Sequence, residues 1–163
     1  MSDPNATAAG RDTTPRSHYR APGWFTRNVF NRIVRGLTGA GRSVRGSRVL
    51  AVRGRRSGQW RTVPVNLLTH EGARYLVAPR GETDWVRNIR AAGGGELRLG
   101  RRSEPFEARE LPDADKPDVL RAYLRHWKAE VGVFFDGVGP DSPVTEVERI
   151  APRHPVFEVV VPS

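Results

Sequence analysis

The residues with the clearest capacity for chemistry lie in one short basic stretch, residues 53–61, which reads Arg-Gly-Arg-Arg-Ser-Gly-Gln-Trp-Arg. Its two glycines permit a tight turn and let the backbone approach a ligand without an intervening Cβ atom. Its serine offers a hydroxyl group, and exposed amides in such turns form concavities that bind anions. Arg55, Arg56 and Arg61 add guanidinium groups, whose fixed donors bind phosphate or carboxylate in pairs. The stretch therefore favours a polyanionic ligand, while a solvated basic turn and nucleic-acid binding are the alternatives.

Two apolar runs flank this stretch and predict the strands that hold it. Residues 48–52 and 61–68 are rich in aliphatic and β-branched side chains, so with the loop between them they predict a hairpin. The loop is not a Walker phosphate-binding loop, because it joins two strands and lacks the Gly-x-x-x-x-Gly-Lys-Ser/Thr spacing. A turn at residues 70–72 leads to a third strand at 74–78, which completes an antiparallel meander.

The remainder of the chain alternates helix and strand patterns around turns. Apolar residues at helical spacing predict a short helix at 84–92, which Thr83 can cap and three glycines end. Further along we expect a hairpin of strands 96–99 and 105–111, a longer helix that begins at Pro112, and a final strand at 156–161. Residues 132–154 show no clear element. Together these patterns predict an α+β fold, a small β-barrel of about six mostly antiparallel strands with two to three covering helices.

The N-terminal segment differs from the rest in composition. Residues 1–22 are polar with almost no aliphatic content, which predicts a disordered tail, and we expect residues 23–163 to form a single domain. Residues 23–37 predict a basic amphipathic helix, because aromatic and aliphatic side chains recur at helical spacing with arginines between them. Packing of its apolar stripe on the domain is the first interpretation, and peripheral contact with an anionic membrane is the alternative.

Composition excludes several classes of protein. The 163-residue chain has no cysteine, which rules out disulfides, thiolate-bound metals and thiol catalysis, and its four scattered histidines predict no metal site. No apolar run approaches the ~20 residues that span a bilayer, and no secretory signal is visible, so we expect a cytoplasmic protein. The net charge of the chain is +9, and the positive charge is concentrated in residues 1–61, which contain thirteen arginines and only two aspartates. This concentration favours an anionic partner. No nucleic acid is expected, because no groove-reading helix or stacking motif accompanies these arginines.

Three motifs in the sequence together resemble those of the deazaflavin-dependent nitroreductase (quinone reductase) family of actinobacteria. The family pattern is a Gly-Arg-Lys/Arg-Ser/Thr-Gly-Gln-x-Arg loop, a proline in the following strand, and a Trp-x-x-Asn-Leu/Ile helix. In this chain the three motifs are residues 54–61, Pro64 and residues 85–89, in the same order. The resemblance runs from about residue 24 to about residue 128 and is clearest from 48 to 111.

The resemblance implies a split β-barrel that binds a reduced 8-hydroxy-5-deazaflavin, coenzyme F420, whose phosphate and oligoglutamate tail make it a polyanion. FMN, which has a similar ring shape, is the alternative cofactor. By position, the loop residues Arg55, Arg56, Ser57 and Arg61 would hold the phosphate and the tail. The second strand would run along the ring, and the end of the third strand and the short helix would border the groove, through Thr62, Val63, Pro64, Val65, Asn66, Val77, Ala78, Pro79, Arg80, Trp85, Arg87 and Asn88.

The reaction of such a family is hydride transfer from C5 of the deazaflavin to an electron-poor acceptor of the quinone or nitro class. The resemblance therefore implies a reductase, whose catalytic residues stay unassigned. The chain departs from the family pattern on the acceptor side, because Asn66 stands where some members have a tyrosine and no tyrosine follows Tyr123. Trp127, Phe134 and Phe135, like Tyr123, can wall the acceptor pocket or belong to the core. A non-catalytic deazaflavin carrier is the alternative function.

Overall fold

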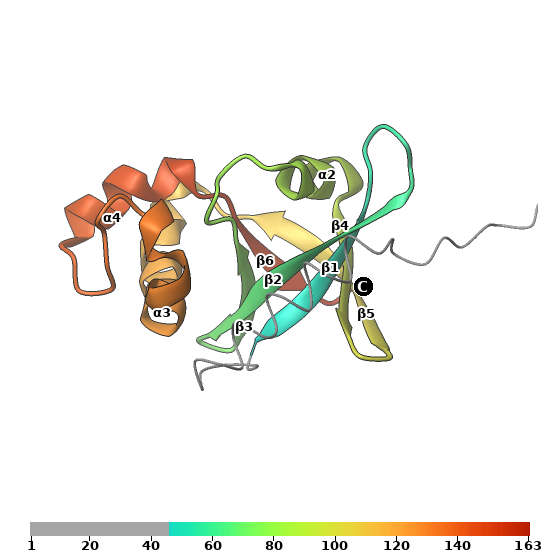
Figure 1. Cartoon of the computed structure of the whole chain (residues 1–163), viewed down its shortest axis with the longest axis horizontal. Coiled ribbons are helices and arrows are strands. Elements are labelled where there is room, and N and C mark those ends of the chain that lie inside the picture. Colours follow the sequence, from blue (N-terminus) through green and yellow to red (C-terminus); the bar gives the residue numbers. More distant parts are fainter. Residues whose placement is uncertain (1–45) are drawn as a thin grey trace, which may run out of the picture.

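Six strands form a closed antiparallel barrel in the computed structural model, which describes residues 46–163 (Figure 1). The strands are β1 (Ser47–Arg53), β2 (Trp60–His70), β3 (Ala73–Val77), β4 (Gly94–Leu99), β5 (Arg102–Glu110) and β6 (Val156–Val160). Around the barrel their order is β1-β2-β3-β6-β5-β4, and the pairing of β1 with β4 closes it. The predicted α+β barrel of about six antiparallel strands is confirmed.

The barrel interior is filled by apolar side chains from its strands. Leu50 on β1, Leu76 on β3, Leu97 on β4, Phe106 on β5 and Phe157 on β6 are buried in one cluster. Because successive side chains of a strand point to opposite faces, the same strands also present residues to the outside of the barrel. The interior is thus packed, and a ligand must bind on the outer surface of the strands or at the barrel ends.

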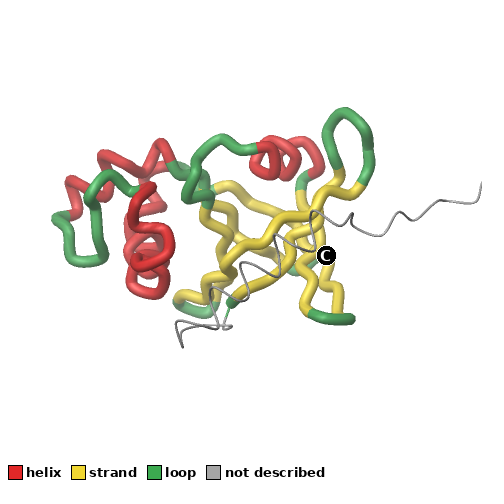
Figure 2. Tube along the Cα trace, in the orientation of Figure 1, coloured by secondary structure: helices red, strands yellow, loops and turns green. Residues whose placement is uncertain are grey.

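Three α-helices of the described chain cover this barrel from two sides (Figures 1 and 2). In the view of Figure 1, α2 (Asp84–Ala92) lies above the barrel near the β1–β2 loop, while α3 (Lys116–Val131) and α4 (Val144–Ile150) lie to its left. The short 3-10 helices η1 (Asp113–Asp115), η2 (Gly132–Phe134) and η3 (Ala151–Arg153) adjoin α3 and α4. Apolar side chains of α3 and α4 form a second core against β3 and β6.

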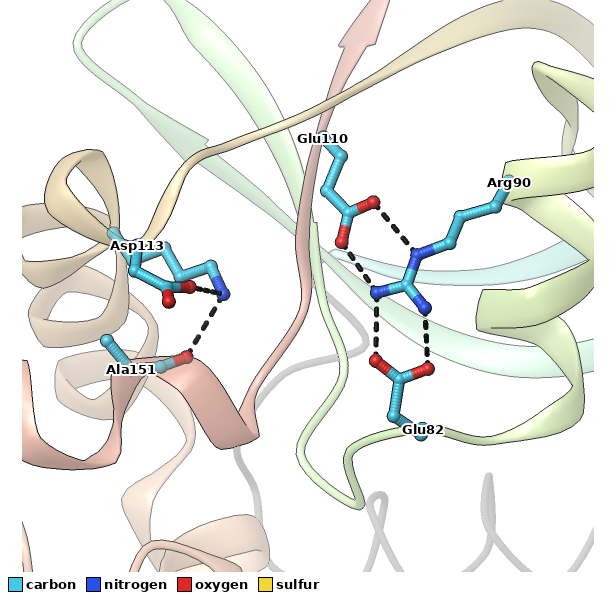
Figure 3. A network of polar contacts seen from close by, with 6 residues as sticks. Glu82, Arg90, Glu110, Asp113 and Ala151 are labelled. Atoms are coloured by element: carbon cyan, nitrogen blue, oxygen red, sulfur yellow. Dashed lines mark hydrogen bonds and ion pairs between the residues drawn. The ribbon is translucent and has the colours of Figure 1, made fainter.

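Polar networks fix both helical parts (Figure 3). Arg90 on α2 donates to both carboxylate oxygens of Glu82, at 2.6 and 2.8 Å, and to both oxygens of Glu110 on β5, at 2.7 and 2.9 Å. The buried ammonium group of Lys116 donates to Asp113 at 2.6 Å and to a backbone carbonyl of η3 at 3.1 Å. The Arg90 network holds α2 against the barrel, so the first turn of that helix keeps a fixed place beside the β1–β2 loop.

Three details of the sequence-based prediction change in the structure. Thr83 is the N-cap residue of α2, but its hydroxyl makes no capping bond and is buried without a partner. Gly94 and Gly95, predicted only to end the helix, begin β4, and a Cβ atom on Gly94 would overlap the Phe106 carbonyl oxygen. Gly94 is thus needed for the close approach of β4 and β5.

Residues 132–154, which show no clear pattern in the sequence, contain η2, α4 and η3.

The predicted tail (1–22) and the predicted amphipathic helix (23–37), with its membrane contact, lie outside the described residues. The extent of the predicted single domain, 23–163, therefore stays a prediction. Between residues 46 and 163, no helix is both long and apolar enough to cross a membrane. In the same range, no three or more His, Asp or Glu side chains gather as a metal site requires.

Candidate functional site

A cavity of about 940 Å³ opens between β2, the β1–β2 loop, α2 and the C-terminal part of α3. Its volume lies within the range of roughly 300–1,000 Å³ that is typical of small-molecule sites. We call its loop side the basic end (Arg55, Arg56, Ser57 and Arg61) and its helical side the aromatic end (Tyr123, Glu130, Val131 and Phe134). The remaining lining residues are Ser47, Val52, Gly54, Thr62, Val63, Pro64, Val65, Asn66, Val77, Pro79, Arg80, Thr83, Asp84, Trp85 and Asn88.

The β1–β2 loop is closed on itself by short hydrogen bonds. The Gly54 amide donates to the Gln59 carbonyl at 2.7 Å, and the Gly58 amide donates to the Gly54 carbonyl at 2.8 Å. Gly58 has a φ of 68°, a left-handed conformation that glycine adopts without strain. A Cβ atom on Gly54 would lie 2.8 Å from Ser57 Oγ, so a side chain there would displace the Ser57 hydroxyl. The glycines of the motif thus set the loop shape.

Arg55 fastens this loop to α2. Asn88 Oδ1 accepts hydrogen bonds from both the Arg55 backbone N–H, at 3.1 Å, and Arg55 Nη1, at 2.9 Å. The Arg55 guanidinium also pairs with Asp84, one helical turn before Asn88, at 3.3 Å. Asn88 is buried, and the two hydrogen bonds from Arg55 satisfy its side-chain oxygen. Arg55 therefore has a structural role in positioning the loop, and part of its charge is neutralised.

Arg56 and Arg61 differ from Arg55, because the guanidinium group of neither makes an ion pair or hydrogen bond with a residue of the described part of the chain. Both are exposed, and both line the cavity. Arg53 is occupied instead: its guanidinium lies 4.1 Å from the centre of the Trp60 ring and donates to the Gly58 carbonyl at 3.1 Å. The charge available to an anionic ligand at the basic end is therefore mainly that of Arg56 and Arg61.

Apolar side chains form the wall between the two ends. Val63 and Val65 on β2 and Trp85 on α2 pack against the barrel core, while part of their surface lines the cavity. The Trp85 ring lies 6.1 Å from that of Phe157, which holds the indole against the barrel. This wall provides a flat apolar surface on which an aromatic ring system can lie.

The aromatic end is built by α3, from its middle to its C-terminus, and by η2. Tyr123 is 2 % exposed, and its ring packs 5.0 Å from that of Trp127. Phe134 is 38 % exposed, and the Arg80 guanidinium lies 5.1 Å from the centre of its ring. Trp127 and Phe135, the other two expected wall residues, belong to the core. Of the four aromatic candidates, only Tyr123 and Phe134 therefore reach the cavity.

The environment of Tyr123 keeps its hydroxyl protonated. Burial raises the pKa of Tyr123 to about 12, with a contribution from the negative charge of Glu130, while hydrogen bonding by the Asn66 side chain acts in the opposite direction. Two residues that are distant in the sequence thus meet at one place in the cavity.

The structure brings together all but two of the predicted site residues. Ala78 is buried in the barrel core, and its carbonyl oxygen accepts a hydrogen bond from His154 Nδ1 at 3.2 Å. Arg87 is exposed on α2 and does not line the cavity. Both neighbours of Ala78, Val77 and Pro79, do line it. Ala78 therefore supports the wall from behind, whereas Arg87 has no place in it.

Sequence analysis missed several lining residues, namely Ser47, Val52, Gly54 as a wall residue, Thr83, Asp84, Glu130 and Val131. Asp84 had a detectable signal, because it precedes Asn88 by four residues in a predicted helix, and such residues share a helix face. Glu130 and Val131 had none, since only tertiary packing brings the end of α3 to β2.

A comparison with protein-family models identifies one family: residues 24–145 match the F420H2-dependent quinone reductase model. The chain belongs to this family. The resemblance in the sequence motifs is thereby confirmed, and with it the class of enzyme, a reductase that uses coenzyme F420. No curated protein matches this reductase significantly.

Solved structures with a similar fold include several of comparable size. A chain described as a domain-swapped dimer is 20 % identical, with a TM-score of 0.50 over 83 % of this chain and 96 % of its own. A conserved hypothetical protein of Mycobacterium tuberculosis is 15 % identical, with a TM-score of 0.50 over 81 % and 80 %. A structure described as an F420-H2 dependent reductase (FDR-A) is 22 % identical, with a TM-score of 0.49 over 71 % and 94 %. At such identities the first two likenesses describe the fold alone.

Proposed function

We propose that this F420-dependent reductase binds the coenzyme with its phosphate and glutamate tail at the basic end and its ring along β2, and that it reduces a quinone or nitro compound at the aromatic end. The observation that carries the proposal is continuity: one cavity joins an apolar wall, a buried phenol and two guanidinium groups that have no ion-pair partner between residues 46 and 163. Hydride transfer requires the two reacting atoms to approach within ~3–3.5 Å, so a continuous cavity matters more than an acid or a base.

The residues of the basic end fit a phosphorylated coenzyme. Arg56 and Arg61 have no carboxylate partner in the described part of the chain, so their charges are available to a phosphate or to glutamate carboxylates. Ser57 Oγ accepts a hydrogen bond from the Gln59 amide at 3.2 Å, which leaves its own proton free to donate. Arg55 contributes less to the ligand, because Asp84 and Asn88 already bind it.

The protein's own residues supply position and a dry surface, while the bound coenzyme supplies hydride chemistry. The hydrogen bonds of Arg55 to Asn88 hold the loop in place before binding, which reduces the ordering cost that a mobile loop would add. Val63, Val65 and Trp85 would exclude water from a ring that lies on them. Such exclusion protects a hydride donor from side reactions and strengthens electrostatic contacts.

The aromatic end supports a planar acceptor with oxygen atoms at its edge. Val131 and Phe134 offer apolar surface, and Tyr123 offers a protonated hydroxyl. Quinones and nitroaromatic compounds share this combination of a flat apolar body and peripheral oxygens. Negative charge develops on these oxygens as a hydride is accepted, and a fixed donor stabilises that charge.

Fluorescence titration followed by rapid mixing tests the proposal. The purified full-length chain is titrated with oxidised F420 and, in parallel, with FMN, and is then mixed with reduced F420 and menadione or a nitroaromatic acceptor. We expect saturable binding of F420, much weaker binding of FMN, and rapid reoxidation of F420 that depends on the acceptor. Binding without turnover of either acceptor favours the carrier function, and binding of FMN alone contradicts the proposed coenzyme site.

We further propose a cytoplasmic location, with peripheral contact of residues 23–37 with an anionic membrane. The proposal is supported by the basic amphipathic pattern of that segment. Cosedimentation of the full chain with phosphatidylglycerol vesicles, but not with phosphatidylcholine vesicles, is the expected result. Equal recovery with both kinds of vesicle contradicts the contact.

A further inference from the structure

The aromatic end of the cavity carries a carboxylate that the proposed reaction does not use. Glu130, in the last turn of α3, is exposed and lines the cavity beside Val131. The other carboxylate of the lining, Asp84, already pairs with Arg55 at 3.3 Å. The Glu130 carboxylate makes no ion pair or hydrogen bond with a residue between 46 and 163. Within this part of the chain, Glu130 therefore places an uncompensated negative charge at the aromatic end.

The two nearby cationic side chains are directed elsewhere. Lys128 lies in the same turn of α3, but its Nζ atom is 3.2 Å from where a Cβ atom on Gly139 would be, and Lys128 does not line the cavity. Arg80 does line the cavity, but its guanidinium lies 5.1 Å from the centre of the Phe134 ring and forms no ion pair with Glu130. Neither cation therefore neutralises the Glu130 carboxylate by direct contact.

The charge of Glu130 acts on the buried wall of the aromatic end. Burial is the main cause of the raised pKa of Tyr123, and the negative charge of Glu130 contributes in the same direction. Charges interact more strongly beside a protein wall than in bulk water, because the effective dielectric constant is lower there. A ligand that lies against Tyr123 and Val131 is exposed to the same field, since both residues line the cavity together with Glu130.

We infer that Glu130 discriminates between acceptors by their charge: it favours neutral or cationic ring compounds and disfavours those that carry a carboxylate or a sulfonate. The inference rests on the proposed function and narrows the chemical class of its acceptor. Specificity of this kind comes from repulsion of the wrong ligand and needs no contact with the reacting atoms. The two ends of the cavity then differ in sign, because anionic groups are favoured beside Arg56 and Arg61 and disfavoured beside Glu130.

Calorimetric titration with a matched set of quinones tests this discrimination without requiring turnover. Three naphthoquinones share one ring and one linker, which ends in a methyl, a trimethylammonium or a carboxylate group. Each is titrated into the full-length protein loaded with oxidised F420, for the wild type, Glu130→Gln and Glu130→Lys. The quantity compared is the Kd of the anionic quinone divided by that of the cationic quinone. We expect this ratio to fall about tenfold in Glu130→Gln and about 100-fold in Glu130→Lys, while the Kd of the methyl compound changes little.

Glu148→Gln is the matched control, because it removes the same charge at another place. Glu148 is exposed on α4, lies outside the cavity lining and has no ion-pair partner between residues 46 and 163. We expect the ratio in this variant to stay within about twofold of the wild-type value, since an exposed charge more than about 10 Å away is largely screened. The difference between the wild type and Glu130→Gln should shrink when NaCl is raised from about 20 to about 500 mM, because salt screens charge but not shape.

The outcomes separate the inference from the proposed function. An equal ratio in the wild type and Glu130→Gln overturns the inference even if the protein reduces all three quinones, and so does an equal fall in Glu148→Gln. The expected fall in a protein that does not oxidise reduced F420 with any of these quinones supports the inference and contradicts the proposed reaction. Glu130→Lys gives the same comparison if Glu130→Gln fails to fold. Absence of binding of all three quinones to the loaded wild type overturns the inference for quinones.

Discussion

The two ends of the cavity are constructed in different ways. The basic end comes from one hairpin loop and the start of β2, and hydrogen bonds of Arg55 to Asn88 at 2.9 and 3.1 Å fasten the loop to α2. The aromatic end comes from α3 and η2, and there Tyr123 and Asn66 of β2 line the cavity together. One end carries arginine side chains, and the other combines apolar side chains with Glu130 and the Tyr123 hydroxyl.

This difference teaches how coenzyme and acceptor recognition can vary separately. The basic end needs several residues at fixed spacing in a local motif, so a change at any one of them disturbs the loop. The aromatic end uses side chains of α3 and η2 that pack on a shared core, and one of them can be exchanged without moving the loop. A fold of this kind therefore determines the coenzyme more strictly than the acceptor.

The largest effect is expected from removal of the Arg56 and Arg61 charges at the basic end. Each charged hydrogen bond is worth roughly 1.5–3 kcal/mol, so the double variant Arg56→Ala with Arg61→Ala should weaken F420 binding by about 100-fold or more. Fluorescence titration measures the change in Kd. The matched control is Arg101→Ala with Arg102→Ala, two exposed arginines outside the cavity lining. Equal Kd values for the two double variants would remove the assigned phosphate site.

A smaller effect is expected when the lock between loop and helix is broken. Asn88→Ala removes the acceptor of two hydrogen bonds from Arg55, both partly buried, and each such bond is worth about 0.5–1.5 kcal/mol. We expect a lower free energy of unfolding by about this amount in urea denaturation, and about tenfold weaker F420 binding, because the loop is no longer held in position. Arg87→Ala, one residue away and exposed, should change neither quantity. A stability loss without weaker binding would show that the lock serves the fold alone.

At the aromatic end we expect a still smaller effect, confined to the acceptor. Phe134→Ala removes apolar surface and the ring beneath Arg80, a loss of about 1 kcal/mol, so the KM for menadione should rise about fivefold. The Kd for F420 should not change, and Val133→Ala should have no effect, since Val133 is 84 % exposed and outside the lining. A change in F420 affinity in Phe134→Ala would contradict the separation of the two ends.

The smallest effect concerns His154, which packs behind the cavity wall, and it is a dependence of the free energy of unfolding on pH. Burial lowers the pKa of His154, and its ring stacks on Phe135 at 4.2 Å and bonds the Ala78 carbonyl. Because the folded-state pKa lies below the unfolded value of 6.5, the unfolded state binds more protons in acid, and stability is lost as pH falls below about 6.5. Urea denaturation at pH 7.5 and pH 5 should show that the free energy of unfolding falls less between these two pH values in His154→Asn than in the wild type. Equal losses would exclude His154 as a source of this pH dependence.

Local features of the structure could be predicted from the sequence, and tertiary ones could not. The hairpin around residues 53–61 and the helix at 84–92 follow from turn residues and apolar periodicity, which act over a few positions. The role of Arg55 did not follow, because its partner Asn88 lies on another element. The sequence pattern therefore predicts a basic loop correctly but gives all its arginines the same role.

The aromatic end illustrates the same limit more strongly. The sequence offers four aromatic candidates on one segment, and only packing decides that Tyr123 and Phe134 reach the cavity while Trp127 and Phe135 fill the core. The meeting of Tyr123 with Asn66 depends on where α3 crosses β2, which no local pattern encodes.

The most direct test of the account is a comparison of two ligands that differ only in their anionic part. Wild type and Arg56→Ala with Arg61→Ala are each titrated with oxidised F420 and with 8-hydroxy-5-deazariboflavin, which lacks the phosphate and the glutamate tail. The account predicts that the wild type binds F420 at least about 100-fold more tightly, and that this ratio collapses in the double variant while the affinity for the shorter ligand is kept. An equal ratio in both proteins, or equal wild-type affinity for both ligands, would contradict a basic end that holds the anionic part of the coenzyme.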